Sequence, residues 1–195
     1  LTRPAVRWAR DHGIESINLD LVYGLPHQTL ETMEATLGGV VDLEPDRIAL
    51  YSYAHVPSVL EHQRLIPEDA LPDPGTRLRL FKQALERLTA EAGYRFIGLD
   101  HFAKPDDQLA CAQQNGTLRR NFQGYSTRAG ADVYAFGISG IHQLSGLYAQ
   151  NTKALRTYYG QIDQDELTVY RGCRPTAEDR LRRHVIMQLM CNAEL

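Results

Sequence analysis

The stretch 119-RRNFQGYSTR-128 carries the side chains best suited to bind an anion. Arg119, Arg120 and Arg128 fall within ten residues, and Gln123 adds an amide between them. Guanidinium groups bind carboxylates through paired, charge-assisted hydrogen bonds. The stretch lacks the period of an amphipathic helix, which favours an extended segment. We predict a binding surface for a polyanionic small molecule here, with a solvated loop as the alternative.

Asp20 is the second position of interest, because it interrupts the apolar stretch 16-SINLDLVYG-24. A carboxylate within a buried strand is costly unless a partner compensates its charge. It would therefore either accept hydrogen bonds from a ligand amine or ribose, or form an ion pair with a neighbouring Arg or Lys.

A third polar position is the pair Asp100 and His101, which follows an apolar run. Adjacent strand residues face opposite sides of a sheet, so we do not expect these two side chains to contact each other.

Several common catalytic and metal-binding motifs are absent from the sequence. It has no HExxH zinc motif, no GxGxxG or GxxxxGK[ST] phosphate loop and no GxSxG nucleophile elbow. Gly137 and Gly140 form only a GxxG, which indicates tight packing more than a ligand site. Cys111, Cys173 and Cys191 are odd in number and far apart, so we expect reduced thiols and no metal site.

The amino-acid composition and the net charge narrow the choice of binding partner and cellular compartment. The 195 residues carry 21 Lys and Arg against 24 Asp and Glu, a formal net charge of −3. No global positive field would attract nucleic acid. No apolar run approaches the roughly 20 residues of a membrane span, and no secretory signal is visible at the start. The expected location is therefore cytoplasmic, without a nucleic-acid partner.

Hydrophobic periodicity predicts an α/β protein. Helix, strand, helix and strand alternate over the first 53 residues, which is typical of consecutive units of a parallel sheet or barrel. Ligands bind at the carboxyl ends of such strands, so Asp20 and the residues after the second strand are the first places to look. The predicted helices are 2–13 (capped by Thr2), from Thr29 to Val41, 74–93, 106–114, 151–160 and 177–195 (capped by Thr176, with Leu181, Val185 and Leu189 in the core), and the predicted strands are 16–24, 47–53 and 95–103.

Several strings taken together resemble the oxygen-independent coproporphyrinogen III oxidases, a family of radical S-adenosylmethionine enzymes. They are 17-INLDLVYGLPHQT-29, 51-YSYAHVPS-58, 93-GYRFIGLDHFAKPDDQLA-110, 119-RRNFQGYSTRAGAD-132 and 148-YAQNTKALRTYY-159. The first is shared across radical-enzyme relatives, whereas the combination of DHFAKPDD and RNFQGYST is specific. The resemblance implies that residues 1–145 form the last βα units of a partial TIM-like barrel with substrate-pocket segments. It also implies that residues 146–195 begin a mainly helical carboxyl-terminal domain.

The same resemblance implies the reaction. Such enzymes oxidatively decarboxylate two propionates of coproporphyrinogen III to vinyl groups, giving protoporphyrinogen IX in haem biosynthesis. A 4Fe-4S cluster and two S-adenosylmethionine molecules serve as cofactors, and the 5′-deoxyadenosyl radical removes a hydrogen from the propionate. The electron donor and acceptor are left open, and a monomer is expected for the whole enzyme.

Site residues follow from the resemblance position by position. Asp20, Ala54 and Ile141 match S-adenosylmethionine contacts, and Gln123 matches a residue near the second cofactor or the substrate. The substrate carboxylates would bind Arg119, Arg120 and Arg128, with Lys104 as a weaker candidate and with Phe122 and Tyr125 either against the tetrapyrrole or in the core. No catalytic residue is assigned within this chain.

The chain departs from the family pattern in one respect. The CxxxCxxC loop that holds the cluster has no counterpart in the sequence, so we expect a fragment without cluster ligands and without redox activity of its own. Two alternatives stay open. One is a non-catalytic, chaperone-like module that binds haem or another tetrapyrrole, and the other is an interaction fragment whose exposed barrel edge pairs with a separate amino-terminal half.

Overall fold

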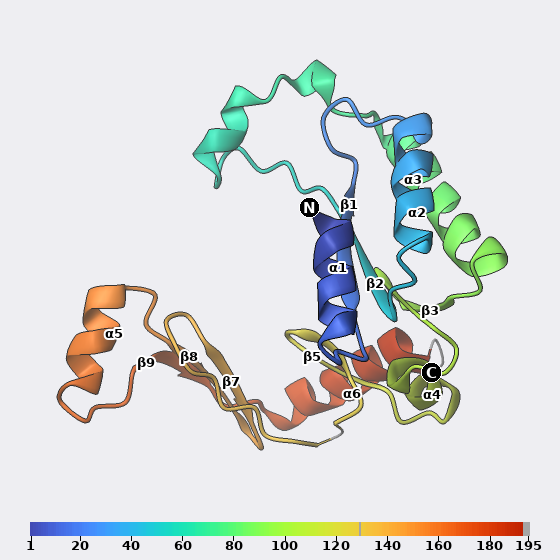
Figure 1. The fold of residues 1–195 in the computed structure, drawn as a ribbon. Coiled ribbons are helices and arrows are strands. Elements are labelled where there is room, and N and C mark those ends of the chain that lie inside the picture. The colour runs from blue at the N-terminus through green and yellow to red at the C-terminus, as the bar shows by residue number, and fades with distance from the viewer. Residues whose placement is uncertain (129, 193–195) are drawn as a thin grey trace. The chain divides into compact units, whose positions relative to one another are not determined.

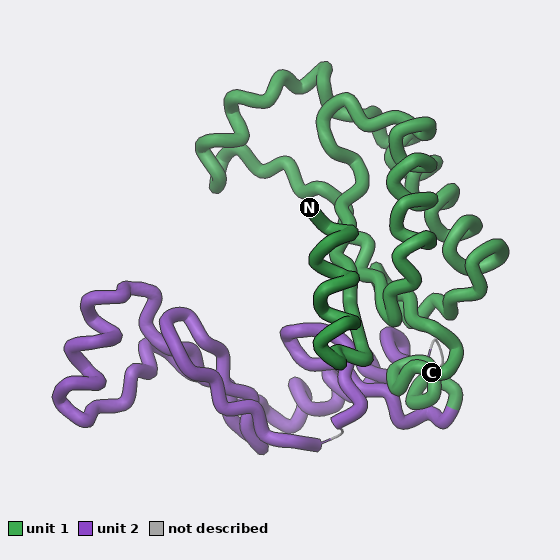
Figure 2. Tube along the Cα trace, in the orientation of Figure 1, with its two compact units in different colours: residues 1–114 green, residues 115–195 purple. Residues whose placement is uncertain are grey.

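A computed structural model describes residues 1–128 and 130–192. The chain divides into two compact units, Leu1–Gln114 and Asn115–Leu195, which Figure 2 colours separately. Each unit is described by itself. None of the helices in the described ranges is long and apolar enough to cross a membrane.

Unit 1 is built on a four-stranded mixed sheet with helices around it (Figure 1). The strand order is β1-β2-β4-β3; β1 and β2 are parallel, while β4 is antiparallel to both β2 and β3. The strands are β1 (Asn18–Tyr23), β2 (Arg47–Ser52), β3 (Arg95–Gly98) and β4 (His101–Ala103). The helices are α1 (Thr2–Asp11), α2 (Leu30–Val41), η1 (Glu61–Leu65), η2 (Glu68–Ala70), α3 (Pro74–Glu86) with its π-helical continuation Arg87–Glu91, and α4 (Gln108–Gln114).

Helices α2 and α3 cover one face of this sheet and form the core with it. Figure 1 shows the two helices together, and their buried residues join those of β2 and β4 in one cluster. The cluster contains Met33, Leu37, Val40, Ile48, Leu50, Leu80, Ala84, Leu88, Tyr94 and Phe102. Leu19 and Leu21 of β1 pack against it, while Asp20 and Val22 point to the other face and are exposed within the described chain. The alternation of β1 thus leaves Asp20 on the face that α2 and α3 do not cover.

The predicted starts of the helices are confirmed in part. Thr29 caps α2 as expected: its Oγ1 accepts from the Thr32 amide at 3.3 Å, and Thr32 Oγ1 accepts from the Thr29 amide at 2.9 Å. Thr176 likewise caps α6, because its Oγ1 accepts from the Asp179 amide at 3.1 Å. The predicted cap at Thr2 is wrong, because α1 begins one residue earlier than a cap there would allow and Thr2 lies inside the helix.

The single strand expected over residues 95–103 is wrong as well. The segment is a tight antiparallel hairpin of β3 and β4. Gly98 has φ 139° and Leu99 has φ 51°, so the chain reverses at these two residues. Positive φ is open to glycine without a steric penalty, and Gly98 is therefore the residue that permits the reversal.

In its described residues, 115–128 and 130–192, unit 2 contains two separate antiparallel sheets and two helices. The hairpin of β5 (Arg119–Asn121) and β6 (Gly124–Ser126) forms the first sheet. The second has the order β7-β8-β9, from β7 (Ile141–Leu144), β8 (Leu147–Asn151) and β9 (Val169–Cys173). The helices are α5 (Leu155–Ile162) and α6 (Ala177–Asn192).

Unit 2 bears on three expectations about the second half of the chain. Residues 146–195 contain the strands β8 and β9 beside α5 and α6, and the helix expected from residue 151 begins only at Leu155; that these residues begin a mainly helical domain stays a prediction. The two compact units meet after Gln114, whereas residues 145 and 146 form the turn between β7 and β8; a domain boundary at 145 stays a prediction. Finally, the face of α6 expected in the core is exposed in the described chain, with Leu181, Val185 and Leu189 at 64%, 38% and 48%.

Candidate functional site

Asp20 in unit 1 presents its carboxylate on the uncovered face of the sheet. Asn18, two residues earlier on the same face, donates a hydrogen bond from Nδ2 to Asp20 Oδ1 at 2.6 Å. None of the ion pairs among the described residues involves Asp20. The sequence left a choice between an ion pair and a ligand contact for Asp20. No ion pair forms within the described chain, and the exposed carboxylate can accept a hydrogen bond from a ligand hydroxyl or amine.

Asp100 and His101 do contact each other, contrary to expectation. His101 Nδ1 lies 2.6 Å from Asp100 Oδ1. The strand argument failed because Asp100 belongs to the turn before β4, where side chains do not alternate. His101 is paired across the sheet with Ala49, which is paired in turn with Asp20. His101 and Asp20 therefore lie in one cross-strand row on the same face.

Ala54 follows the carboxyl end of β2 and is held by polar contacts. The Tyr53 amide donates to Tyr23 O at 2.8 Å, which ties the ends of β1 and β2 together. The Ala54 carbonyl accepts from Gln63 Nε2 at 3.0 Å, and Gln63 is only 5% exposed. A buried amide thus fixes the backbone at Ala54, a role that the sequence did not indicate for Gln63.

In unit 2, the β5–β6 hairpin presents Arg120 against Tyr125. The two residues face each other across the strands, and the guanidinium carbon lies 4.8 Å from the ring centroid. Tyr125 donates its hydroxyl to Met190 O of α6 at 2.9 Å, so the hairpin is attached to that helix. Nη1 of Arg120 is buried and has no hydrogen-bond partner among the described residues. The hairpin therefore holds the Arg120 guanidinium group in place while its Nη1 donor stays unpaired within the described residues.

A cavity of about 910 Å³ lies in unit 2, and it brings together all three arginines predicted to bind an anion. The segments that line it are the β5–β6 hairpin, residues 128 and 130–133 after it, the β7–β8 hairpin near its turn, the end of β9 with Pro175, and one face of α6. Its charged residues are Arg119, Arg120, Arg128, Arg180, Arg183, Asp132 and Asp179, with His184 beside them. Five arginines against two aspartates make the cavity strongly cationic, although the chain as a whole is acidic.

The pKa of the Cys191 thiol, which is buried in α6, is affected by these charges. Burial raises the pKa of its thiol, while the positive charges of Arg119 and Arg120 act in the opposite direction. The net effect is a raised pKa, so the thiol stays protonated near neutral pH and behaves as a packing group.

Gln123 and Ile141 do not line this cavity. Gln123 is exposed in the turn between β5 and β6, where its backbone amide donates to Asn121 Oδ1 at 2.8 Å. Ile141 begins β7. Of the two GxxG glycines near it, Gly140 serves close packing, since a Cβ there would lie 3.0 Å from the Ala135 Cβ and 3.2 Å from Gly137 O. A Cβ on Gly137 would meet nothing within 4 Å, and this glycine instead has φ 93°.

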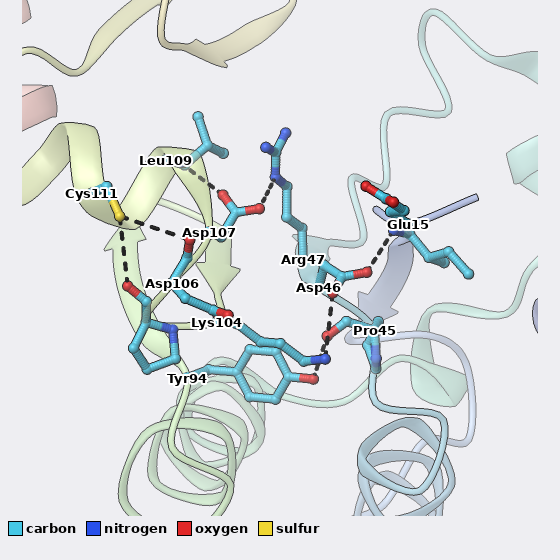
Figure 3. Close-up of polar contacts among 12 residues, drawn as sticks. Glu15, Pro45, Asp46, Arg47, Tyr94, Lys104, Asp106, Asp107, Leu109 and Cys111 are labelled. Atoms are coloured by element: carbon cyan, nitrogen blue, oxygen red, sulfur yellow. Dashed lines mark hydrogen bonds and ion pairs between the residues drawn. The ribbon is translucent and has the colours of Figure 1, made fainter. Parts of the chain in front are cut away.

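Lys104, the weaker candidate for substrate binding, takes part in a network at the start of β2 (Figure 3). Its ammonium group lies 3.4 Å from Asp46 Oδ1. Asp46 also accepts from Arg10 at 2.6 Å and from the Ile17 amide at 2.8 Å. The network joins segments that precede β1 and β2 to the segment after β4, so a stabilising role explains Lys104.

Comparison with known proteins shows what this chain is related to. It is 47% identical to the oxygen-independent coproporphyrinogen III oxidase of Pseudomonas aeruginosa over 100% of this chain and 42% of that protein. It is 46% identical to the enzyme of the same name from Escherichia coli over 96% of this chain and 41% of that one. The solved structure of the Escherichia coli coproporphyrinogen III oxidase, described as a radical SAM enzyme, matches with a TM-score of 0.93 at 44% identity, over 98% of this chain and 44% of that one.

The chain is therefore a homologue, over nearly its whole length, of part of the oxygen-independent coproporphyrinogen III oxidases. The predicted resemblance is thereby confirmed. The chain spans less than half the length of the Pseudomonas and Escherichia oxidases. No protein-family model matches it.

The oxidase family implies an iron-sulfur cluster, and the residues present do not fit one. Cys111 lies in α4, Cys173 in β9 and Cys191 in α6, and the described residues contain no group of three or more His, Cys, Asp or Glu that could hold a metal ion. No step of the reaction is therefore assigned to a cluster on these residues.

Helix α6 carries a further signal that is visible in the amino-acid sequence. Arg180, Arg183, His184 and Met187 are spaced i, i+3, i+4 and i+7, and all four line the cavity. That spacing places them on one face of α6. The face could have been noticed in the sequence, but only the fold shows that it lies at the same cavity as the β5–β6 hairpin.

Proposed function

We propose that this chain is part of an oxygen-independent coproporphyrinogen III dehydrogenase. The complete enzyme would convert two propionates of coproporphyrinogen III to vinyl groups with loss of carbon dioxide, giving protoporphyrinogen IX in haem biosynthesis. The observation that carries the proposal is the 45–47% identity to several oxidases over nearly the whole chain. Because the match covers 42% of the Pseudomonas oxidase, the activity of the complete protein is inferred.

In this proposal the cavity of unit 2 binds the carboxylates of the substrate. Coproporphyrinogen III has four propionates, and Arg119, Arg120 and Arg128 line one cavity. A hydrogen bond to a charged group contributes about 1.5–3 kcal/mol, so a few such contacts could orient a tetracarboxylate. The cavity also has apolar walls, from Leu144 and Met187 among others, which suit the hydrocarbon parts of a tetrapyrrole.

The cofactor contacts are a second part of the proposal. Asp20 and Ala54 in unit 1, with Ile141 and Gln123 in unit 2, would contact the two S-adenosylmethionine molecules. The exposed Asp20 carboxylate fits a ribose hydroxyl or an amine, and the backbone at Ala54 is fixed by Gln63. When bound, S-adenosylmethionine supplies the hydrogen-abstracting radical, and the residues of this chain would hold and orient it.

The remaining expectations stay proposals of the same kind. Residues 1–145 would be the last βα units of a radical-SAM barrel, which the parallel pair of β1 and β2 with α2 between them supports. The complete oxidase would act in the cytoplasm as a monomer. Its electron donor and acceptor are not assigned.

A chimera tests the proposal. This chain would replace the matching segment of the Pseudomonas oxidase, to which it is 47% identical. After anaerobic iron-sulfide reconstitution, formation of protoporphyrinogen IX would be measured with S-adenosylmethionine and a chemical reductant. Asp20→Asn in the chimera should raise the S-adenosylmethionine concentration needed for half-maximal rate by about 10–100-fold, the equivalent of one lost charge-assisted hydrogen bond.

The matched control is Asp42→Asn, which changes an exposed carboxylate at the end of α2 and should leave the rate unchanged. A chimera that shows cluster absorbance and binds S-adenosylmethionine, yet forms no product, would contradict the proposed function. If that chimera still bound a tetrapyrrole, the non-catalytic binding module would be the better description.

A further inference from the structure

Helix α6 contributes a second set of cations to the cavity of unit 2. Arg180 and Arg183 occupy the face of α6 that lines it, next to His184. They come from an element that is distinct from the β5–β6 hairpin, which carries Arg119 and Arg120. The cavity thus has cationic groups on two elements, as a ligand with several carboxylates requires.

Arg183 is held in place by an aromatic ring and not by a carboxylate. Its guanidinium carbon lies 5.7 Å from the ring centroid of Tyr148 in β8. None of the ion pairs of the described residues includes Arg183, whereas its neighbour Arg182 pairs with Glu178. A guanidinium group over an aromatic face keeps its N–H edge available for hydrogen bonds. The arrangement repeats the one between Arg120 and Tyr125.

The two aspartates of the cavity are engaged elsewhere. Asp179 accepts from the Thr176 hydroxyl at 2.8 Å and from the Thr176 amide at 2.9 Å, which completes the cap of α6. Asp132 accepts from the Ser145 amide at 2.7 Å in the β7–β8 turn. Neither forms an ion pair with Arg183 or Arg120 within the described ranges. Both carboxylates keep their negative charge, but five arginines against two aspartates still leave an excess of positive charge among the described lining residues, and a bound polyanion would reduce the repulsion among the arginines.

We infer that Arg183 is a specificity-determining residue, which binds a carboxylate of the tetrapyrrole substrate from the α6 side of the cavity. The inference rests on the proposed function, because it takes the substrate class from it. Tyr148 positions the guanidinium group, and the hairpin arginines bind other carboxylates of the same molecule. Tetracarboxylates would then be selected over tetrapyrroles with fewer acid groups, since a missing carboxylate leaves Arg183 without its ligand.

Binding to the 195-residue chain tests this inference. The probe is coproporphyrin III, the air-stable oxidised form with four carboxylates, titrated by its fluorescence. Arg183→Ala should weaken binding by about tenfold, and Arg183→Lys should restore part of the loss, because it returns the charge without the planar fork. Arg182→Ala is the matched control, since Arg182 neighbours Arg183 on α6 but is not among the cavity residues. Circular dichroism of each variant checks that α6 is retained.

A second probe, a benzene tetracarboxylate, separates the inference from the proposed function. Equal coproporphyrin III binding by wild type and Arg183→Ala, with Arg120→Ala weakened, overturns the role of Arg183 and leaves the proposed function standing. Arg183-dependent binding of both probes with equal affinity supports the carboxylate role and counts against a tetrapyrrole substrate. Binding of neither probe by the folded chain overturns the inference. Weaker coproporphyrin III binding by Arg182→Ala than by Arg183→Ala would also overturn it.

Discussion

Replacing Asp46 by Asn tests the polar network that attaches α1 to the sheet of unit 1. One carboxylate oxygen accepts from Arg10 of α1 at 2.6 Å and from the Ile17 amide at 2.8 Å, and the other lies 3.4 Å from Lys104. The Asp46 side chain is only 19% exposed. An amide of the same shape keeps one acceptor but loses the negative charge, and its NH2 group would face a cation.

The expected loss is about 2 kcal/mol in the free energy of unfolding of unit 1, the range measured for hydrogen bonds to charged groups. Asp42→Asn is the matched control, because Asp42 also pairs with an arginine of α1, Arg3, at 3.1 Å. Those two side chains are 65% and 57% exposed, so the control should lose about 0–1 kcal/mol.

The assay is urea unfolding followed by the fluorescence of Trp8, which is the only tryptophan and lies in α1. The ring of Trp8 lies 4.5 Å from that of His12, so its signal should report the integrity of this helix. Equal losses for Asp46→Asn and Asp42→Asn, or a loss below about 0.5 kcal/mol for Asp46→Asn, would refute the argument from burial.

The pH dependence provides a second check on Asp46. Burial raises the pKa of its carboxyl, but the hydrogen bonds from the Ile17 amide and Arg10 and the charge of Lys104 outweigh this and lower the pKa overall. A lowered pKa means that the unfolded state binds more protons as the pH falls. The contribution of Asp46 should be complete above its ordinary pKa of about 4 and disappear as the pH falls through the lower folded value. The difference between wild type and Asp46→Asn should therefore shrink at acidic pH.

Two further predictions concern packing and a buried hydroxyl. Gly140→Ala should destabilise unit 2 by about 1–3 kcal/mol, since its Cβ would lie 3.0 Å from the Ala135 Cβ, whereas Gly160→Ala in α5, with nothing within 4 Å, should be neutral or stabilising in thermal unfolding followed by circular dichroism. Tyr94 donates to Pro45 O at 2.6 Å, and burial together with nearby carboxylates raises its pKa to about 12. In an absorbance titration of the wild type, one tyrosine should ionise only near pH 12, and this ionisation should be absent from Tyr94→Phe. Because the pKa is raised in the folded state, the free energy of unfolding should fall as the pH rises from about 10 through about 12.

Local patterns in the sequence predicted the elements whose causes are themselves local. The cap at Thr29, the parallel pair of β1 and β2 and the helix that begins at residue 74 follow from capping chemistry and hydrophobic period within short windows. Where a single residue changed the backbone, local reasoning failed. The reversal at Gly98 and Leu99 produced a hairpin from an apparent strand and brought Asp100 to His101.

The sequence by itself determined the resemblance to the oxygen-independent coproporphyrinogen III oxidases, because the matching strings need no three-dimensional information. It also marked Arg119, Arg120 and Arg128 as a cationic group. Only the tertiary structure decided that α6, more than 50 residues later in the chain, adds Arg183 to the same cavity. It also decided that Lys104 forms an ion pair with Asp46. The physical reason is that binding and ion pairing depend on distances in space, and chain folding fixes these distances between segments that no sequence window contains together.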